Sequence, residues 1–281
     1  MDVHGWCTRT CTGRLILTKD AFQRLQTSWS IQIRVIHALM IRELITRFGR
    51  ENIGFLWIMA EPLLFAGLVG ALWHFTHGAT EHGVGVIAFV ATGYIPITLF
   101  RHGVARSVAV FTVNNSLLYH RQIKIVDFIL SRFVIEFLGS MMAYLFMAIV
   151  LIGFGEFPIP DNIGLLIGGW LVYSFFCFGI CMVIAPLSEI SEAMEKFIPV
   201  TTYIMIPFSG LFYMVSWVTP GARDFLLLSP FVNGMEMMRK GIWGSHVTAY
   251  YNVWNPIVCS VIATLIGLIL CRRVRRDLNV E

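Results

Sequence analysis

Six apolar stretches, each long enough to cross a lipid bilayer as a helix, constrain this chain more than any other feature. A transmembrane helix needs about 20 consecutive apolar residues to cross a hydrocarbon layer of about 30 Å. The stretches are continuous rather than alternating, and backbone in lipid must satisfy its own hydrogen bonds, so helices rather than strands are predicted. The fold class is therefore an all-α polytopic membrane protein with six transmembrane helices, over Phe55–Phe75, Val86–Val110, Phe128–Phe154, Ile163–Pro186, Phe197–Trp217 and Val253–Leu270.

The charge content of the chain agrees with this class. Only 14% of its 281 residues are charged, against about 25% in soluble globular proteins. The formal net charge of +4 comes mostly from the two ends of the chain: eight Lys and Arg lie in residues 1–54, and the last apolar stretch is followed by Arg272, Arg273, Arg275 and Arg276. This distribution indicates membrane topology and attraction to a lipid surface, and no nucleic-acid partner is expected.

The distribution of Lys and Arg between the connections also predicts the orientation. If the N-terminus is cytoplasmic, fifteen of these residues lie in cytoplasmic segments and three in external segments, as the positive-inside rule requires. We therefore predict that both termini are cytoplasmic. Residues 1–20 would form a cytoplasmic tail, 51–281 a transmembrane domain, and 271–281 a basic cytoplasmic tail within it.

Residues 21–50 combine a helical apolar pattern with regularly placed cations. Apolar side chains recur in steps of three or four, at Phe22, Leu25, Trp29, Ile33, Ile36, Met40, Leu44 and Phe48, and between them fall Arg24, Arg34, Arg42 and Arg47. A helix with two such faces is typical of a membrane surface. We predict an amphipathic interface helix on the cytoplasmic side.

The external connection over residues 218–252 contains a shorter apolar run. This run, Phe225–Met238, is interrupted by Pro230 and Gly234 and has 14 residues, which reach only about 21 Å as a helix. We predict a re-entrant or interfacial helical pair that lines or caps a pathway, because irregular backbone at membrane depth needs cover from protein or a water-filled cavity.

Small residues in the fourth predicted span favour close helix packing. Gly164 and Gly168 are four residues apart, and Gly169 lies beside them. This spacing lets two helix backbones approach closely.

Motifs for catalysis or metal binding are absent from the sequence. The chain has no Gly-x-x-x-x-Gly-Lys-Ser/Thr phosphate loop, no His-Glu-x-x-His and no nucleophile elbow. We expect no catalytic residue, no metal site and no cofactor in this chain. Energy for uphill transport would come from another protein or from an ion gradient.

Three groups of residues match the pattern of a known family. The first and most specific comprises Arg42-Glu43, Arg47-Phe48-Gly49, Gly54-Phe55-Leu56-Trp57 and Glu61-Pro62; the second Asn114, Leu117, Arg121, Lys124 and Asp127; the third Pro230, Glu236 and Arg239. In these groups the chain resembles the inner-membrane permeases of ABC transporters that export capsular polysaccharide, the KpsM/BexB type. Departures are Gln122 and Ile125, where prolines are expected, and Arg101, where a small polar residue is expected. They leave the loop shape and the cargo open.

The resemblance implies an assembly as well as a fold. It implies a homodimer of permeases in the bacterial inner membrane, with two separate ATPase subunits that bind the ATP and Mg²⁺. Periplasmic adaptor and outer-membrane export proteins would then carry a lipid-linked polysaccharide to the cell surface. The implied function is that of the permease subunit of an ATP-driven exporter.

In such an assembly, short cytoplasmic helices transmit the movements of the ATPase to the spans. One predicted contact is the segment 113–125, which mixes apolar and polar side chains at Asn114, Leu117, Leu118, Tyr119, Arg121 and Lys124; a solvated loop is the alternative. The second is an acidic face, whose like charges repel unless a basic surface faces them, formed by Glu189, Glu192 and Glu195.

Candidates for the translocation path are intramembrane ionisable groups and aromatic rings that stack on sugars. Glu61 is a costly group within a span, and Pro62 can bend that helix. Glu61 either lines the inner mouth or pairs with a cation such as Arg106, and a purely structural pair is the alternative. The candidate residues are Trp57, Glu61, Pro62, Tyr94, Phe100, Arg101, Arg106, Pro230, Glu236 and Arg239.

Other functions are compatible with parts of the pattern. The same fold could export O-antigen, teichoic acid or a small molecule. A membrane-embedded glycan-modifying enzyme would need an acidic metal-binding pair or a His-Asp motif, and neither is found. A proton-driven transporter would show internal repeats, which are also not found.

Overall fold

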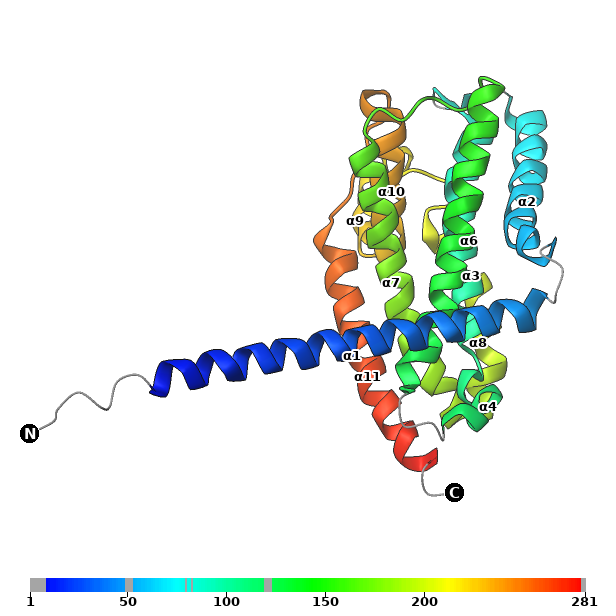
Figure 1. The fold of residues 1–281 in the computed structure, drawn as a ribbon. Coiled ribbons are helices and arrows are strands. Elements are labelled where there is room, and N and C mark those ends of the chain that lie inside the picture. The colour runs from blue at the N-terminus through cyan, green and yellow to red at the C-terminus, as the bar shows by residue number, and fades with distance from the viewer. Residues whose placement is uncertain (1–8, 49–52, 79, 82, 119–122, 279–281) are drawn as a thin grey trace, which may run out of the picture.

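Helices form nearly all of the described part of the chain. The computed structural model describes residues 9–48, 53–78, 80–81, 83–118 and 123–278, with side chains from residue 26 on except 48–59, 61–62, 77, 81, 116, 118 and 277–278. Four of its helices are long and apolar enough to cross a membrane. They run side by side in a bundle (Figure 1) and confirm the all-α membrane class; they are α3 (Val86–Ser107), α6 (Ile125–Gly153), α7 (Ile163–Ile190) and the stretch Trp254–Arg276 of α11 (Trp254–Leu278).

Helix α3 lies at the centre of this bundle. Of its apolar stretch 83% is buried, against 39% in α6 and 22% in α11. Its neighbours are α6, α7, α2 (Ile53–His77) and α8 (Glu192–Ile204). The outer helices instead expose large apolar side chains such as Leu68 and Ile269, a surface suited to lipid.

The ends of α2, α3 and α6 differ from the predicted spans by three residues at most, whereas α7 and α11 extend further beyond theirs. Helix α7 begins at Ile163 as predicted, where the Asn162 side chain accepts a hydrogen bond from Leu165 N, but it continues past Pro186 to Ile190. Helix α11 continues to Leu278. The predicted cytoplasmic tail 271–281 is therefore helical over most of its length.

The predicted continuous helix Phe197–Trp217 is wrong. Helix α8 ends at Ile204, and two 3₁₀ turns follow, η1 (Pro207–Ser209) and η2 (Val215–Trp217). Pro207 lacks the N–H that a continuing helix would use. Gly210 has a φ of 82°, a left-handed conformation that glycine adopts without strain. Apolar composition alone does not reveal this break.

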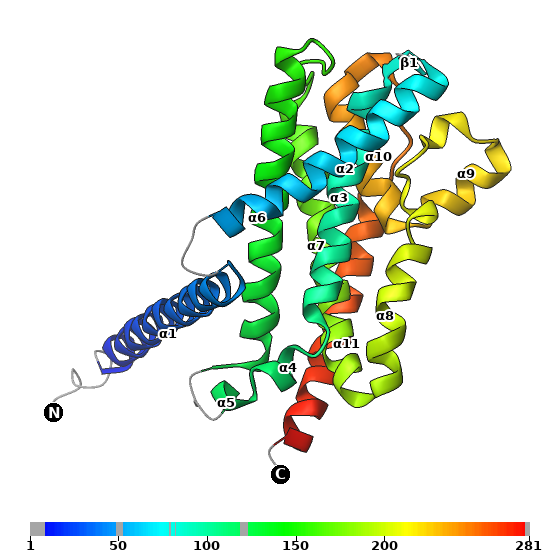
Figure 2. The same ribbon diagram turned by 90° about the vertical axis from the view of Figure 1, so that its right-hand side faces the viewer.

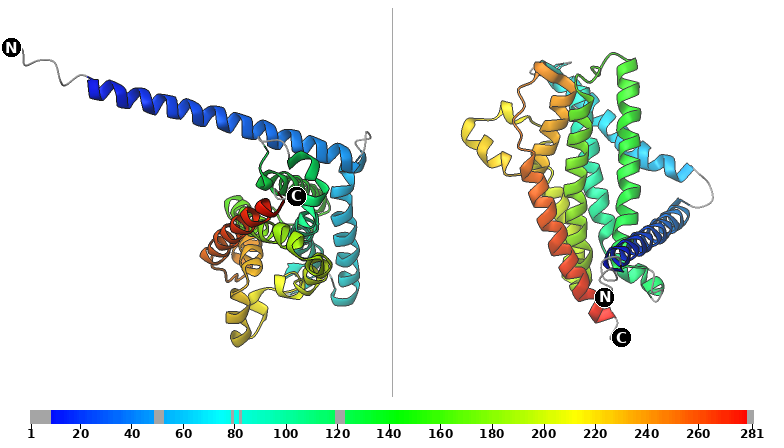
Figure 3. Two further views of the ribbon diagram at one scale, coloured as in Figure 1. Left: turned by 90° about the horizontal axis from the view of Figure 1, so that it is seen from below. Right: turned by 60° about the vertical axis from the view of Figure 1, so that its left-hand side comes forward.

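The interface helix is longer than predicted and buries a different face. Helix α1 (Arg9–Phe48) begins within the predicted tail 1–20 and lies across the bundle, with its first half projecting beyond it (Figures 1 and 3). Its second half contacts α6. Trp29 and Ile33 of the predicted apolar stripe are 67% and 59% exposed, whereas Leu39 is buried. The packing face of α1 therefore combines apolar side chains such as Val35 and Leu39 with polar ones, and the exposed apolar side chains of α1 remain available to lipid.

A small hairpin and two short helices complete the fold. Strands β1 (Thr80–Glu81) and β2 (Val84–Gly85) pair antiparallel between α2 and α3 (Figure 2). The helical pair predicted within residues 218–252 is present as α9 (Pro220–Leu227) and α10 (Pro230–Trp243), followed by η3 (Gly244–His246). Of the two, α10 is buried, mainly against α7.

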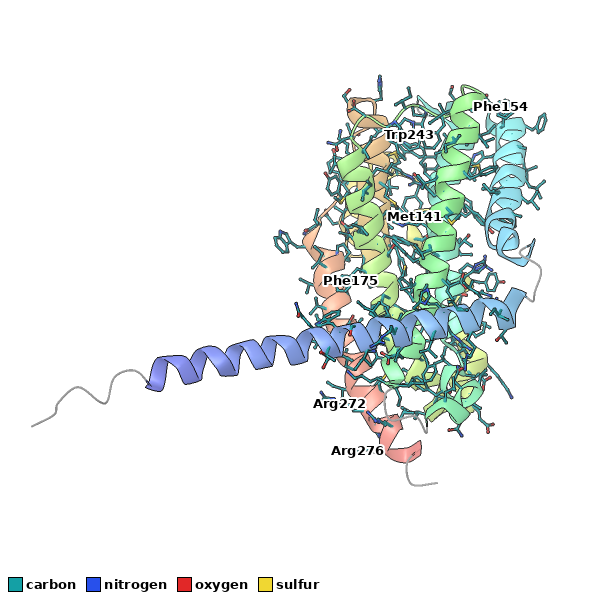
Figure 4. The ribbon with its side chains drawn as sticks, in the orientation of Figure 1. Met141, Phe154, Phe175, Trp243, Arg272 and Arg276 are labelled. Carbon is teal, nitrogen blue, oxygen red and sulfur yellow. The ribbon has the colours of Figure 1, made fainter. Side chains whose placement is uncertain are left out.

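The two ends of the bundle are easily located. Short helices α4 (Val110–Val113) and α5 (Asn115–Leu118) lie at one end, where Arg272 and Arg276 of α11 also project, whereas Phe154 and Trp243 lie toward the other (Figure 4). We call these the α4 end and, after β1 and β2, the hairpin end.

Glycines allow α7 to contact α10 and α11 through backbone atoms. A Cβ at Gly169 would lie 2.8 Å from Met238 N, and one at Gly241 would lie 2.6 Å from Leu166 N. In α11, a Cβ at Gly267 would lie 2.5 Å from Met182 O. Of the predicted pair Gly164 and Gly168 with Gly169 beside it, Gly168 and Gly169 approach α10 closely, whereas a Cβ at Gly164 would meet only the neighbouring Asn162 side chain.

Candidate functional site

The α4 end holds a buried carboxylate, Glu136 of α6, whose side chain is 0% exposed. Arg47 Nη2 of α1 lies 2.5 Å from Glu136 Oε1, and Arg106 Nε of α3 lies 3.8 Å from the same oxygen. His102 Nδ1 of α3 lies 3.6 Å from Oε2. A buried carboxylate without such partners is strongly destabilising. Glu136 therefore joins three helices through charge.

Further polar contacts attach α1 to the same end. Arg132 Nε of α6 lies 3.2 Å from Glu43 Oε1 of α1, and Arg132 Nη1 donates to Arg106 O at 2.8 Å. Gln32 donates to the Asp127 carboxylate at the start of α6. These bonds add to the apolar contacts of Val35 and Leu39 in holding α1 against the bundle.

A cavity of about 330 Å³ lies among these contacts. Residues of α1, α3, α4 and α6 line it, together with Asn114, which follows α4: Arg42, Glu43, Thr46, Arg47, Arg106, Val113, Asn114 and Arg132. Four arginines face a single lining glutamate, so the cavity is cationic and suits an anion. Within the described part of the chain, no group of three or more His, Cys, Asp or Glu could hold a metal ion.

Sequence reasoning missed this charged cluster. Arg132 and Glu136 are four residues apart in an apolar run, and ionisable residues inside a predicted span are functional candidates. That rule was applied to Glu61, Arg101 and Arg106, but not to Arg132 or Glu136. Applied to Glu136 it would have identified the cluster, although not its partners on α1.

The predicted coupling segment is partly described. Asn114 is buried; its side chain accepts from Arg42 and donates to Val110 O at 2.7 Å. Leu117 packs on the apolar core, and Lys124, with an exposed side chain, caps α6. Outside the described residues lie the side chain of Leu118 and all of Tyr119 and Arg121.

The three predicted glutamates do not form one acidic face. Ser191 is extended between α7 and α8, so the helix that carries Glu189 ends before Glu192. Glu189 accepts hydrogen bonds from the N–H groups of Phe111 and Thr112 at 3.1 and 3.0 Å. It therefore holds α4 against α7, whereas Glu192 and Glu195 lie exposed on α8.

At the hairpin end, Glu236 of α10 satisfies backbone donors. Its two oxygens accept from Val215 N at 3.1 Å and from Tyr250 N at 3.2 Å. The Glu236 side chain thereby connects the irregular segment before α9, which contains Val215, to the one after α10, which contains Tyr250.

Arg239, one turn further along α10, satisfies backbone acceptors. Its guanidinium donates to Gly210 O, Leu211 O and Tyr213 O at 2.7 to 2.9 Å and lies 3.9 Å from the Phe89 ring centroid. Both side chains are 1% exposed. The contacts of Glu236 and Arg239 stabilise the irregular segment that follows α8. Both residues were predicted to line the translocation path, and the contacts observed for them are structural.

The predicted path aromatics contact other protein side chains. Tyr94 stacks on Phe65 with ring centroids 4.5 Å apart, and Phe100 meets Phe231 edge to face at 4.7 Å. Both predicted rings are buried. Pro230 begins α10, where its missing N–H costs no helical bond.

The predicted path cations lie apart from one another. The Arg101 guanidinium lies 4.4 Å from the ring centroid of Tyr203 on α8, whereas Arg106 faces Glu136. The side chains of Trp57, Glu61 and Pro62 lie outside the described part of the chain, and with them the predicted pairing of Arg106 with Glu61.

Comparison with known proteins places the chain in a family. The family model described as ABC-2 type transporter matches residues 34–243. The chain belongs to the ABC-2 type transporter family. The match includes both buried glutamates and all eight residues that line the cavity of this ABC-2 family chain.

Relatives of this ABC-2 family chain align nearly end to end. The capsule polysaccharide export inner-membrane protein CtrC of Neisseria meningitidis serogroup B is 37% identical over 241 residues, 86% of this chain and 91% of the relative. The capsule polysaccharide export inner-membrane protein BexB of Haemophilus influenzae is 31% identical over 252 residues, 90% of this chain and 95% of the relative. The polysialic acid transport protein KpsM of Escherichia coli is 23% identical over 251 residues, covering 88% and 96%. The family resemblance read from three groups of residues is confirmed.

Proposed function

We propose that this ABC-2 family chain is the transmembrane permease subunit of an ATP-driven exporter, which moves a lipid-linked capsular polysaccharide across the bacterial inner membrane. The observation that carries the proposal is the nearly end-to-end similarity to CtrC and BexB. The four long apolar helices support a multi-pass membrane position.

Six crossings are proposed, by α2, α3, α6, α7, α8 and α11. Helix α8 has 13 residues and reaches about 20 Å, so its crossing includes the irregular residues 205–217. An even number of crossings leaves both termini on one side. The Lys and Arg of α1 and of the end of α11 favour the cytoplasm, which makes the α4 end cytoplasmic and the hairpin end periplasmic.

In this orientation α9 and α10 form a re-entrant pair that enters from the periplasm. Irregular backbone is tolerated at membrane depth only where its polar groups are satisfied and covered. The bonds of Glu236 and Arg239 meet that requirement for residues 210–215. They support a re-entrant position without requiring contact with the cargo.

Two ATPase subunits would bind at the α4 end and supply the ATP and Mg²⁺ sites. The proposed contacts are the segment 113–125, including Tyr119 and Arg121, and the exposed Glu192 and Glu195 at the start of α8. The bonds from Glu189 to α4 support this, because they connect the first contact region to α7, a membrane helix.

The polymer path is proposed to form between two copies of the chain. The central position of α3, with 83% of its apolar stretch buried, supports this, because side chains fill the interior of one copy. Periplasmic adaptor and outer-membrane proteins would receive the polymer at the hairpin end.

The test is the location of capsular polymer after deletion of the gene, by surface staining and by fractionation of the cell. We expect surface polymer to disappear and lipid-linked polymer to accumulate inside, with recovery on re-expression. Loss of polymer from both places would indicate a role in synthesis instead. Unchanged surface polymer would refute the proposed function.

A further inference from the structure

We propose that the cavity at the α4 end is a binding site for a phosphate group, and that its occupant is the headgroup of an anionic phospholipid of the cytoplasmic leaflet. The proposal rests on the proposed function for one point only, the position of the α4 end at the cytoplasmic membrane surface. The cavity itself is defined by its lining residues, its charge and its surroundings.

The described side chains around the cavity carry more positive than negative charge. Four lining arginines face Glu43, and the Glu136 carboxylate contacts Arg47 and Arg106, so among these described groups the cations outnumber the carboxylates. Arg42 in particular donates to a neutral amide, that of Asn114. Arginine presents five N–H donors in a planar fork that fits phosphate oxygens. The cavity is therefore suited to an anion that can accept several hydrogen bonds.

The cavity has the size of a ligand site and an open rim. Its volume of about 330 Å³ falls within the range of small-molecule sites. At its rim, the Arg106 side chain is 47% exposed and Val113 is 69% exposed. A ligand can therefore reach the buried arginines from outside the protein.

The surroundings favour a lipid over free phosphate. On α1, Ile41 and Ile45 directly precede the lining residues Arg42 and Thr46, and they are 44% and 59% exposed. An exposed apolar side chain next to a cationic one is the arrangement found on helices that lie at a membrane surface. A headgroup in the cavity would leave its acyl chains beside these isoleucines.

A bound headgroup would contact the proposed coupling region. Val113 ends α4 and Asn114 follows it, and both line the cavity. Helices α1, α3 and α6 contribute the remaining lining residues. Lipid binding would thus reinforce the attachment of α4 to these helices in the resting protein.

The test uses the full chain purified in neutral detergent, without ATPase or polymer. The midpoint of thermal unfolding is measured during titration with phosphatidylglycerol, phosphatidylcholine or inorganic phosphate. We expect a saturable rise with phosphatidylglycerol that exceeds the rise with phosphatidylcholine, and a weaker response to phosphate. Equal saturation by inorganic phosphate would support the phosphate site but assign it to a free ion. No difference between the two lipids would overturn the proposal.

Two pairs of variants assign the effect to the cavity. Val113→Glu adds a negative charge to the rim without removing a hydrogen bond, and Val113→Gln shows the effect of side-chain size alone. Arg106→Gln removes a lining charge, and Arg272→Gln makes the same change on exposed α11. We expect Arg106→Gln to need about tenfold more phosphatidylglycerol for half-saturation than Arg272→Gln, the effect of one charge-assisted hydrogen bond. We expect Val113→Glu to need more phosphatidylglycerol than Val113→Gln, because the added carboxylate repels the phosphate.

Equal half-saturation within both pairs would remove the cavity as the site. This outcome is independent of the proposed function, because binding is measured without cargo. Conversely, selective lipid binding by a chain whose deletion leaves surface polymer unchanged would refute the proposed function alone.

Discussion

Two buried glutamates, one at each end of the bundle, have different kinds of partners. Glu136 at the α4 end faces cationic side chains, including Arg47, which lies 89 residues away in the chain. Glu236 at the hairpin end accepts hydrogen bonds from the backbone of Val215 and Tyr250. Side-chain partners can be exchanged when helices shift, whereas backbone partners are lost only if the segment unfolds. The comparison teaches that the hairpin end is a fixed closure and the α4 end an adjustable junction.

The largest effect is expected from Arg239→Met at the hairpin end. The substitution leaves three buried carbonyls without their donor. We expect a loss of about 3–5 kcal/mol in the free energy of unfolding, because each buried polar group left without its partner costs about 1–3 kcal/mol. Denaturant titration in detergent measures it, with the exposed Arg276→Met as control. Similar stability of the two variants would contradict the fixed closure.

A smaller loss of stability is expected from Glu136→Gln at the α4 end. The change removes the Glu136 charge that faces Arg47 and Arg106, but the Arg106 side chain is 47% exposed and can turn to water. We expect a loss of about 2 kcal/mol in the same titration, together with reduced polymer export. Asp224→Asn on exposed α9 is the control. A loss as large as that of Arg239→Met would remove the distinction between the two ends.

The pair Arg132 and Glu43 measures one exchangeable contact directly. Their atoms lie 3.2 Å apart and both side chains are mostly buried. A double-mutant cycle with Arg132→Gln and Glu43→Gln should give a coupling energy of about 1 kcal/mol. Additive effects of the two substitutions would show that α1 is held to α6 by other contacts.

The smallest effect on stability is expected from Glu189→Ala. This glutamate is an exception to the difference between the two ends. Glu189 lies at the α4 end but accepts from backbone N–H groups, as Glu236 does. Because α4 is short and Thr112 is exposed, we expect a loss of less than about 1 kcal/mol in global stability. Hydrogen exchange of the Phe111 and Thr112 amides should accelerate. Unchanged exchange would show that Glu189 does not hold α4.

The long helices could be predicted because hydrocarbon thickness leaves few alternatives to an apolar helix. The beginning of α7 at Ile163 was predicted for this reason. The break after Ile204 was not, because apolar residues fill both helical and irregular segments at membrane depth. Pro207 and Gly210 were the available signals, and their meaning depends on partners such as Arg239 from another helix.

The charged site was predicted only in part for the same reason. Arg106 and Asn114 were identified from their positions, but their partners depend on how α1 lies across the bundle. Glu136 was identifiable as an ionisable residue in a span. Nothing in the local sequence pairs it with Arg47, because that contact is made between distant segments.

The backbone contacts made by the glycines along α7 have a mechanical consequence. Where Gly169 and Gly241 join α7 to α10, and Gly267 joins α11 to α7, little side-chain material lies between the helices to be compressed or rearranged. Helices in such close contact shift little relative to one another when a force acts on one of them. Helices α7, α10 and α11 should therefore move together during transport.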